Sequence, residues 1–205
     1  MILKLQHEEC NLNSTSNLIK ELTVMANQII GPAIICDIDG TAAIGIGNGE
    51  GQRKAYDYHK CGNDMPNYVV FSIIAMYLNT MRDEGGKVIF LSGRENVEFP
   101  GKSERKDICY RQAIFNDKEY PDCKTLTHDW IRFYGDGWGI KDTDFELHMR
   151  NADDYRPDDE IKEEFYHNII DGRFIVDFVL DDRNQVVRKW RELGLTCLQV
   201  ADGNF

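Results

Sequence analysis

Short apolar runs alternate along this chain with stretches whose apolar residues recur at helical spacing. The runs that read as buried strands cover residues 32–36, 87–91, 145–149, 174–180 and 196–200. Apolar residues three and four positions apart predict helices over residues 14–30, 68–82, 158–170 and 184–193. Apolar strands that alternate with amphipathic helices are typical of a parallel sheet covered on both faces. We therefore predict an α/β fold with a mostly parallel sheet.

Two regions do not follow this pattern. Residues 42–63 are rich in glycine and polar residues, so we predict a flap after the first strand and not a part of the main sheet. The region from 94 to 144 carries few regular signals, and we expect short helices there over 104–115 and 127–134. Residues 1–30 are predicted to be an N-terminal helical extension of one domain over residues 31–205.

The composition limits the classes of partner. The 35 Asp and Glu against 24 Lys and Arg give a net charge of −11, which argues against a broad nucleic-acid-binding face but permits a small basic pocket for one phosphate. The chain has no apolar run of membrane-spanning length and no signal-peptide core, so we expect a soluble, cytoplasmic protein without a membrane partner. Six cysteines without a CxxC pair argue against a zinc site, and reduced thiols fit them better than a disulfide framework.

The polar residues that follow the predicted strands are the candidates for a functional site, because ligands of parallel sheets bind at the carboxyl ends of the strands. Three groups have this position: Asp37 and Asp39 in the stretch DIDGT, Ser92-Gly93-Arg94, and Asp181-Asp182. Residues two apart on an extended strand point to the same side, so Asp37 and Asp39 can address one bound group. Gly40 then lets the chain turn sharply away.

Four carboxylates at one edge of a sheet need a positive partner. Two like charges 4 Å apart repel by about 4 kcal/mol at an effective dielectric constant of about 20. Oxygen ligands with room for water and phosphate are what Mg²⁺ prefers, so we predict a Mg²⁺ site. DIDGT alone also reads as a simple turn. The second acid pair, the SGR stretch and a later lysine, all in the same chain order, argue against that interpretation.

The order of these groups resembles that of the haloacid dehalogenase (HAD) phosphatases: DIDGT, SGR after an apolar strand, Lys162 on a helix, and the Asp181-Asp182 pair after a strand. The chain is similar in particular to the 3′-phosphatase domain of phage polynucleotide kinase/phosphatase. That similarity lies in GQRKAYDYHKC at 51–61, RPDDEIKEEF at 156–165 and residues 181–205. It implies an HAD-like, Rossmannoid three-layer α/β/α fold, in which residues 96–144 form an insertion longer than that of the phage domain.

The resemblance implies a phosphoaspartate mechanism. Asp37 would be the nucleophile, and Asp39 would be the general acid and then the general base. Lys162 would hold the transferring phosphoryl group and offset the charge on Asp37. Mg²⁺ would be held by Asp37, by the backbone carbonyl of Asp39 and by an acid of the Asp181-Asp182 pair, with the choice between these two left open.

By the same similarity, a further set of residues would bind the phosphate or the substrate, or order the neighbouring groups: Thr41, Arg53, Ser92, Gly93, Arg94 and Asp158. Some of the candidates have plainer alternatives. Arg53 also reads as a surface residue of the flap, and Asp158 as a residue that stabilises a helix N-terminus through the dipole. Lys162 also reads as part of a solvated, highly charged helix face.

Three functions follow as hypotheses. The first is Mg²⁺-dependent removal of 3′-phosphates from DNA or RNA ends. The second keeps this mechanism but acts on small nucleotides such as nucleoside monophosphates, which the acidic net charge favours. The third is a non-catalytic phospho-receiver domain, whose acid pair comes early and whose phosphorylated Asp comes later, the reverse of the order here.

The sequence also bears on the rest of the phage enzyme. Gly101-Lys102-Ser103 looks like the end of a P-loop, but position 96 is Asn where a P-loop has glycine. We therefore expect a phosphatase without the kinase half. Whether the protein forms a homo-oligomer is left open.

Overall fold

A computed structural model of the chain describes residues 29–45, 52–103 and 108–203. Its centre is a five-stranded sheet with the order β11-β10-β1-β4-β9, in which every neighbouring pair is parallel. The strands are β1 (Gly31–Asp37), β4 (Lys87–Asn96), β9 (Phe145–Asn151), β10 (Phe174–Arg183) and β11 (Cys197–Gly203). The predicted α/β fold and each of its five apolar strands are confirmed.

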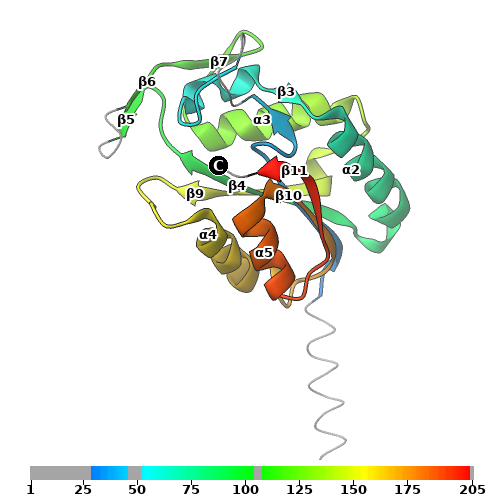
Figure 1. Cartoon of the computed structure of the whole chain (residues 1–205). Helices are drawn as coiled ribbons and strands as arrows, with labels where there is room; N and C mark the ends of the chain where they lie inside the picture. Colours follow the sequence, from blue (N-terminus) through cyan, green and yellow to red (C-terminus); the bar gives the residue numbers. More distant parts are fainter. Residues whose placement is uncertain (1–28, 46–51, 104–107, 204–205) are drawn as a thin grey trace, which may run out of the picture.

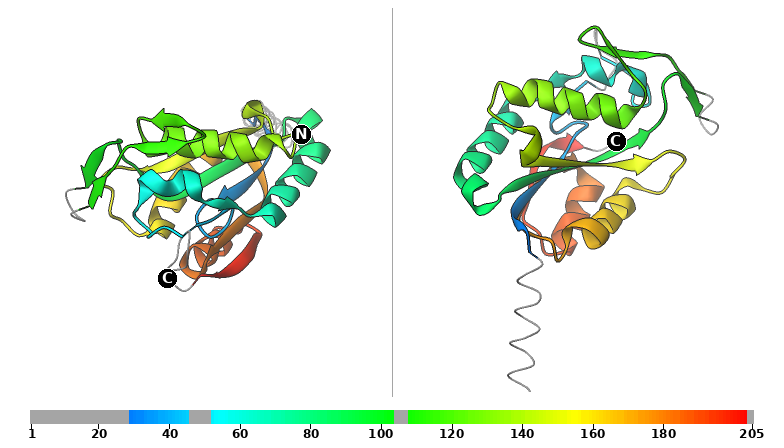
Figure 2. Two further views of the ribbon diagram at one scale, coloured as in Figure 1. Left: turned by 90° about the horizontal axis from the view of Figure 1, so that it is seen from above. Right: turned by 180° about the vertical axis from the view of Figure 1, so that it is seen from behind.

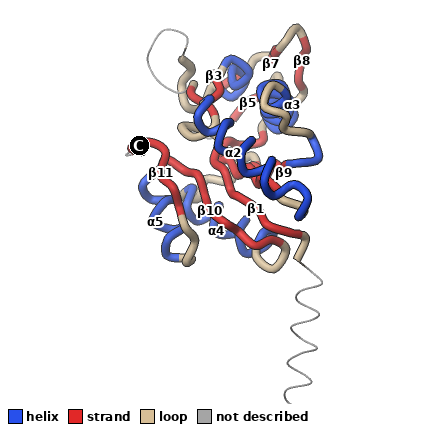
Figure 3. The backbone as a smooth tube through the Cα atoms, turned by 90° about the vertical axis from the view of Figure 1, so that its right-hand side faces the viewer, coloured by secondary structure: helices blue, strands red, loops and turns tan. Residues whose placement is uncertain are grey.

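Helices cover both faces of the sheet. Figures 1 and 2 show α2 (Tyr68–Met81) and α3 (Cys123–Asp136) on one side, and α4 (Asp158–Phe165) and α5 (Asn184–Glu192) on the other. Figure 3 shows the same arrangement with the strands β1, β10 and β11 between the helices. The predicted three-layer α/β/α architecture is therefore confirmed.

Strand β1 lies in the middle of the sheet and is buried on both faces. Ile34 and Cys36 pack into the core beneath α2 and α3, whereas Ala33 and Ile35 pack into the core beneath α4 and α5. Successive residues of a strand point to opposite faces, so a strand covered on both sides requires an unbroken apolar run. Asp37, the last residue of β1, is therefore held in position by a strand that is packed on both faces.

The helix predictions over 68–82 and 184–193 are confirmed, and the predicted 127–134 helix lies inside α3. Asn67 caps α2 by accepting the N–H of Val69, and Asp122 caps α3 by accepting the N–H of Thr125. The helix predicted over 158–170 is α-helical only to Phe165. It continues as a π-helical turn, η4 (Tyr166–Ile170). The helix predicted over 14–30 lies outside the described residues, apart from its last two positions.

The helix predicted over 104–115 is wrong. The described part of this region forms hairpins, in which β5 (Gly101–Ser103) pairs with β6 (Ile108–Tyr110) and β7 (Ala113–Phe115) pairs with β8 (Lys118–Tyr120). Asn116 and Asp117, which join β7 to β8, have φ of 49° and 59°. Two consecutive residues of positive φ make the tight hairpin turn that Asn and Asp tolerate. Burial in β7 has the period of two that is typical of a strand.

The flap is built apart from the main sheet, as predicted. Its short strand β2 (Ala43–Ile44) pairs with β3 (Met65–Pro66), and the 3₁₀ helix η1 (Tyr58–Asn63) packs against α3. Two further 3₁₀ turns, η2 (Arg82–Glu84) and η3 (Asp142–Asp144), precede β4 and β9. Within the described ranges, no helix is long and apolar enough to cross a membrane.

Candidate active site

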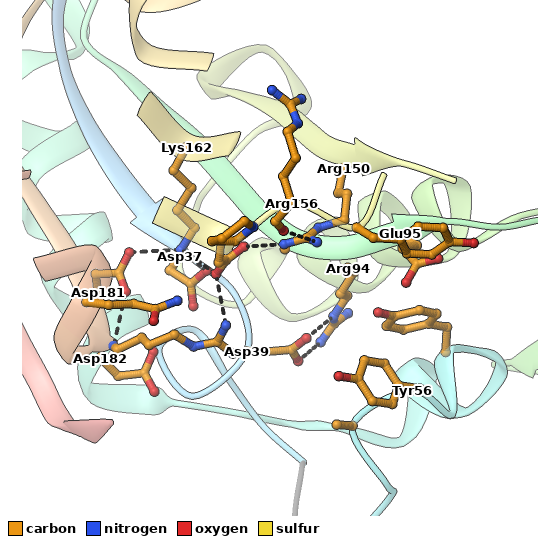
Figure 4. A pocket seen from close by; sticks show the side chains of 18 residues that line it. Asp37, Asp39, Tyr56, Arg94, Glu95, Arg150, Arg156, Lys162, Asp181 and Asp182 are labelled. Carbon is orange, nitrogen blue, oxygen red and sulfur yellow. Dashed lines mark hydrogen bonds and ion pairs between the residues drawn. The ribbon is translucent and has the colours of Figure 1, made fainter. Parts of the chain in front are cut away.

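The predicted groups meet at the carboxyl edge of the sheet, around a cavity of about 530 Å³ (Figure 4). The predicted residues that line it are Asp37, Asp39, Gly93, Arg94, Asp158, Lys162, Asp181 and Asp182. The other three, Thr41, Arg53 and Ser92, do not line the cavity but are buried directly behind residues that do. Each of the three contacts a lining residue.

Lys162 reaches the floor of the cavity from α4. Its Nζ lies 2.6 Å from Asp37 Oδ1 and 2.9 Å from Asp181 Oδ2, and the residue is 1% exposed. Burial by itself would lower the pKa of the lysine, but the carboxylates of Asp181, Asp37 and Asp158 outweigh it and raise the pKa well above its usual value. The alternative of a solvated helix face is therefore wrong for Lys162.

Three carboxylates gather beside this lysine. Asp37, Asp181 and Asp182 each offer an oxygen, and these oxygens lie within 4.8 Å of one another. Burial, together with the neighbouring Asp181 and Asp182, raises the pKa of Asp37 well above its usual range, although Lys162 opposes the shift. A cation would relieve this crowding, and buried carboxylate oxygens are ligands that fit Mg²⁺.

The two acids of the Asp181-Asp182 pair have different surroundings. Asp181 Oδ2 accepts hydrogen bonds from Lys162 Nζ and, at 3.1 Å, from Trp190 Nε1, while Oδ1 accepts the backbone N–H of Arg183 at 3.2 Å. Asp182 Oδ1 accepts a longer bond of 3.3 Å from Thr41 Oγ1. More of the lone pairs of Asp181 are thus engaged, so Asp182 has more capacity to bind a metal.

Two glycines permit close approaches that a side chain would block. Gly40 has a φ of 89°, and a Cβ built there would lie 2.2 Å from Asp182 Oδ2. A Cβ on Gly93 would lie 2.3 Å from Asp158 Oδ1. Real Cβ atoms essentially never come this close to another atom. The glycines of DIDGT and SGR therefore let the two loops pass directly against site carboxylates.

The Asp39 carboxylate is held between two arginines. Arg94 donates from Nε to Oδ2 at 2.9 Å and from Nη2 to Oδ1 at 2.6 Å, and Arg53 Nη2 donates to Oδ1 at 2.6 Å. Burial by itself would raise the pKa of Asp39, but Arg94 and Arg53 outweigh it and lower the pKa. Arg53 is 3% exposed, so the alternative of a surface residue is wrong.

Asp64 completes this group and was missed by the sequence reasoning. It accepts from Arg53 Nε at 2.9 Å and from Arg94 Nη2 at 2.8 Å, and it is 2% exposed. Its backbone carbonyl accepts the N–H of Trp130 in α3 at 2.9 Å. We name Asp39, Arg53, Asp64 and Arg94 the arginine clamp. An acid at the end of a polar flap carries no sequence signal that marks it as a buried partner.

Asp158, the first residue of α4, is surrounded by cations. Arg150 Nη2 donates to Oδ1 at 3.0 Å, Arg183 Nη1 donates to Oδ2 at 3.3 Å, and Lys162 Nζ lies 3.8 Å away. Arg150 lies in β9 and Arg183 ends β10. Sequence reasoning missed both, although the rule that ligands bind at strand carboxyl ends points to them. Ser92, which is buried, accepts the backbone N–H of Arg94 with its Oγ.

Comparison with known proteins places this chain in a family. Residues 31–205 match the family described as the polynucleotide kinase PNKP phosphatase domain. The putative bifunctional polynucleotide kinase/RNA ligase of Autographa californica nuclear polyhedrosis virus is 29% identical over 162 residues, which are 78% of this chain and 18% of that protein.

Two solved structures are also similar to this chain, one of the Pnkp1/Rnl/Hen1 RNA repair complex and the other of the Pnkp1/Rnl/Hen1 complex. Each contains a chain that is 34% identical and covers 86% of this one, with TM-scores of 0.59 and 0.60. Our chain spans 44% and 47% of those chains, and less than a fifth of the viral relative. Since the family match runs from the start of β1 to the last residue, this chain, with its HAD-like α/β fold, belongs to the family of polynucleotide kinase PNKP phosphatase domains.

Proposed function

We propose that this protein is a Mg²⁺-dependent phosphomonoester hydrolase that works through a phosphoaspartate and removes 3′-phosphates from nucleic-acid ends. The observation that carries the proposal is the buried contact of Lys162 with Asp37, beside the carboxylates of Asp181 and Asp182 at the floor of a cavity. A nucleophilic carboxylate, a cation for the phosphoryl group and a ligand set for a metal are together what phosphoryl transfer requires.

The reaction has two halves. In the first, a carboxylate oxygen of Asp37 forms a bond to phosphorus while the ester bond to the leaving oxygen breaks, and Asp39 delivers a proton to that oxygen. In the second, water attacks the phosphorus, Asp39 accepts its proton, and the bond to Asp37 breaks to release inorganic phosphate. The arginine clamp lowers the pKa of Asp39, which favours the ionised form that accepts this proton. The proton accepted here is the one that Asp39 gives to the leaving oxygen in the next turnover, and the lowered pKa makes protonated Asp39 a stronger acid for that step.

Lys162 and the metal site would offset the negative charge of both reactants. Mg²⁺ would be held by Asp37, by Asp182 and, following the family resemblance, by the backbone carbonyl of Asp39. When bound, it would supply Lewis-acid stabilisation of the phosphoryl oxygens. Asp181 would act mainly by positioning Lys162, since its carboxylate already accepts hydrogen bonds from Lys162, Trp190 and the backbone of Arg183.

A phosphatase of small nucleotides with the same mechanism is the second candidate. The net charge of −11 favours it, because a mononucleotide needs no basic groove outside the cavity. The family match and the likeness to a chain of the RNA repair complex support the polynucleotide substrate.

A phosphate-release panel tests both candidates. The substrates are a 3′-phosphorylated DNA oligonucleotide, the same sequence as RNA, their 5′-phosphorylated isomers, and 3′- and 5′-nucleoside monophosphates, each with Mg²⁺ and with EDTA. We expect Mg²⁺-dependent release from the 3′-phosphorylated ends, and activity lower by at least about a thousandfold in Asp37→Asn. Full activity in Asp37→Asn would contradict the mechanism. A preference for mononucleotides would favour the second candidate.

A further inference from the structure

We propose that Tyr56 is the stacking platform for the nucleobase of the nucleotide whose phosphate is removed. This inference rests on the proposed function and deepens it, because it names a residue that selects the leaving group. Tyr56 lies in the flap between Arg53 and η1, inside the stretch GQRKAYDYHKC, but the sequence reasoning gave it no role.

The cavity extends well beyond the acid cluster. In Figure 4, Asp37, Lys162, Asp181 and Asp182 gather at one end, and Tyr56 lies at the other end, past Asp39 and Arg94. The volume of about 530 Å³ lies inside the range of roughly 300–1,000 Å³ that holds a whole small molecule. A phosphate group at Asp37 therefore leaves most of the space for the group attached to it.

The proposed chemistry sets the direction of that group. Asp39 gives its proton to the ester oxygen as the phosphorus–oxygen bond breaks, so the leaving oxygen must lie beside Asp39. The nucleoside is attached to this oxygen and extends away from phosphorus. Tyr56 lines the cavity on that side of Asp39.

Tyr56 is both exposed and held in position. The residue is 47% exposed, and its ring meets the ring of Tyr58 edge to face, with centroids 6.3 Å apart. Tyr58 is 3% exposed and stacks on Tyr110 of the β5–β6 hairpin, 5.9 Å away. On the other side, Arg53 Nη1 donates to the carbonyl of Ala55 at 3.1 Å, so the arginine clamp also fixes the backbone beside Tyr56. An aromatic ring mounted this way is a stacking surface for any base.

Tyr155 is the competing platform. Tyr155 also lines the cavity, and its hydroxyl donates to Asp153 Oδ1 at 2.5 Å. We assign the base to Tyr56 because it is exposed to an incoming base, whereas Tyr155 is only partly exposed. Tyr155 is therefore included in the test.

The test compares two substrates that differ only in the base. One is a 3′-phosphorylated oligonucleotide, and the other carries a tetrahydrofuran abasic analogue at its 3′-phosphorylated position. We measure kcat and KM for the wild type, Tyr56→Leu, Tyr56→Phe and Tyr155→Leu. The matched control is Tyr68→Leu, because Tyr68 is an exposed tyrosine on α2 outside the cavity lining.

We expect Tyr56→Leu to lower kcat/KM for the substrate with a base by about tenfold, mainly through KM, and to lose far less on the abasic substrate. Tenfold corresponds to about 1.4 kcal/mol, inside the range of about 1–3 kcal/mol measured for stacking of one base. Tyr56→Phe should behave as the wild type. Equal losses on both substrates, no loss, or a base-dependent loss in Tyr155→Leu would overturn the inference. A wild type that releases no phosphate from either substrate would instead contradict the proposed function itself.

Discussion

Lys162 Nζ lies 2.6 Å from Asp37 Oδ1 in the interior of the protein, although the two residues are 125 positions apart in the chain. The lysine lies on α4 and the aspartate at the end of β1. Strands β4 and β9 lie between these two elements in the chain. The contact joins a cation to the acid cluster.

Replacing Lys162 by Met should lower both activity and stability. Asp37 and Asp181 would lose their buried cation, which costs about 3–5 kcal/mol of unfolding free energy when one partner of a buried pair is removed. Loss of a charge aimed at the phosphoryl group should lower kcat by at least about 100-fold. Lys189→Met is the matched control, because Lys189 pairs with Glu163 at a more solvated site and should change the unfolding free energy by less than about 1 kcal/mol. Urea unfolding and phosphate release measure both, and an active Lys162→Met enzyme would contradict the proposed role.

Replacement of Asp181 and replacement of Asp182 should have different effects on the stabilisation by Mg²⁺. A ligand that binds only the folded state at 100 times its Kd stabilises it by about 2.7 kcal/mol, so Mg²⁺ should raise the Tm of the wild type and EDTA should reverse the rise. Asp182→Asn should remove most of this shift. Asp181→Asn should lower the Tm already without Mg²⁺, because it disturbs the contacts with Lys162 and Trp190. Identical behaviour of the two variants in a thermal melt would show that our division of their roles is wrong.

Replacing Asp64 by Asn should disrupt the arginine clamp. Arg53 and Arg94 would share one carboxylate in place of two, in a site that is almost fully buried. We expect a loss of about 3–5 kcal/mol in unfolding free energy and lower activity, because Asp39 loses its fixed position. Asp83→Asn makes the same chemical change on an exposed turn and should be close to neutral. An Asp64→Asn protein as stable and active as Asp83→Asn would refute this role.

Gly40→Ala should harm the protein more than the same change at Gly172. Both glycines have positive φ, which costs about 1–2 kcal/mol for a residue with a Cβ. Gly172 has open space around a built Cβ, whereas at Gly40 the Cβ would meet Asp182 at 2.2 Å. Gly172→Ala should therefore lose only the backbone contribution and keep its activity. Gly40→Ala should lose more stability and also its phosphate release, and equal effects in the two variants would exclude the steric explanation.

The stability that Asp144 contributes should depend on pH. Asp144 Oδ2 accepts from Arg82 Nη2 and from the backbone of Lys141, and although burial opposes the shift, these bonds lower its pKa from 3.8. A lowered carboxyl pKa stabilises the folded state above the unfolded pKa, and this stabilisation is lost as the pH falls through the folded pKa. The free energy of unfolding of the wild type should exceed that of Asp144→Asn by roughly 1–3 kcal/mol at pH 7, and this difference should shrink below about pH 4. A difference that is constant down to pH 2.5 would contradict the ionic contribution.

Some features of the site could be predicted because they depend on local pattern and on the geometry common to parallel sheets. Apolar runs and helical spacing predicted the strands and therefore which polar residues follow each strand. Parallel strands bring their carboxyl ends to one edge of the sheet. This placed Asp37, Arg94 and Asp181 together before any contact was known. The π-turn after Phe165 and the hairpins near Tyr110 were missed, because packing decided them against a weak local signal.

The sequence by itself therefore determined the parallel sheet, the edge at which the functional side chains gather, and the types of residue that lie there. Only the tertiary structure decided that Asp64 joins two arginines, that Trp190 and Lys162 engage Asp181 more than Asp182, and that Tyr56 stands at the far end of the cavity. These are contacts between segments remote in the chain. Local periodicity reports which face of an element is buried, but the partner of a buried polar group is set by how the elements pack.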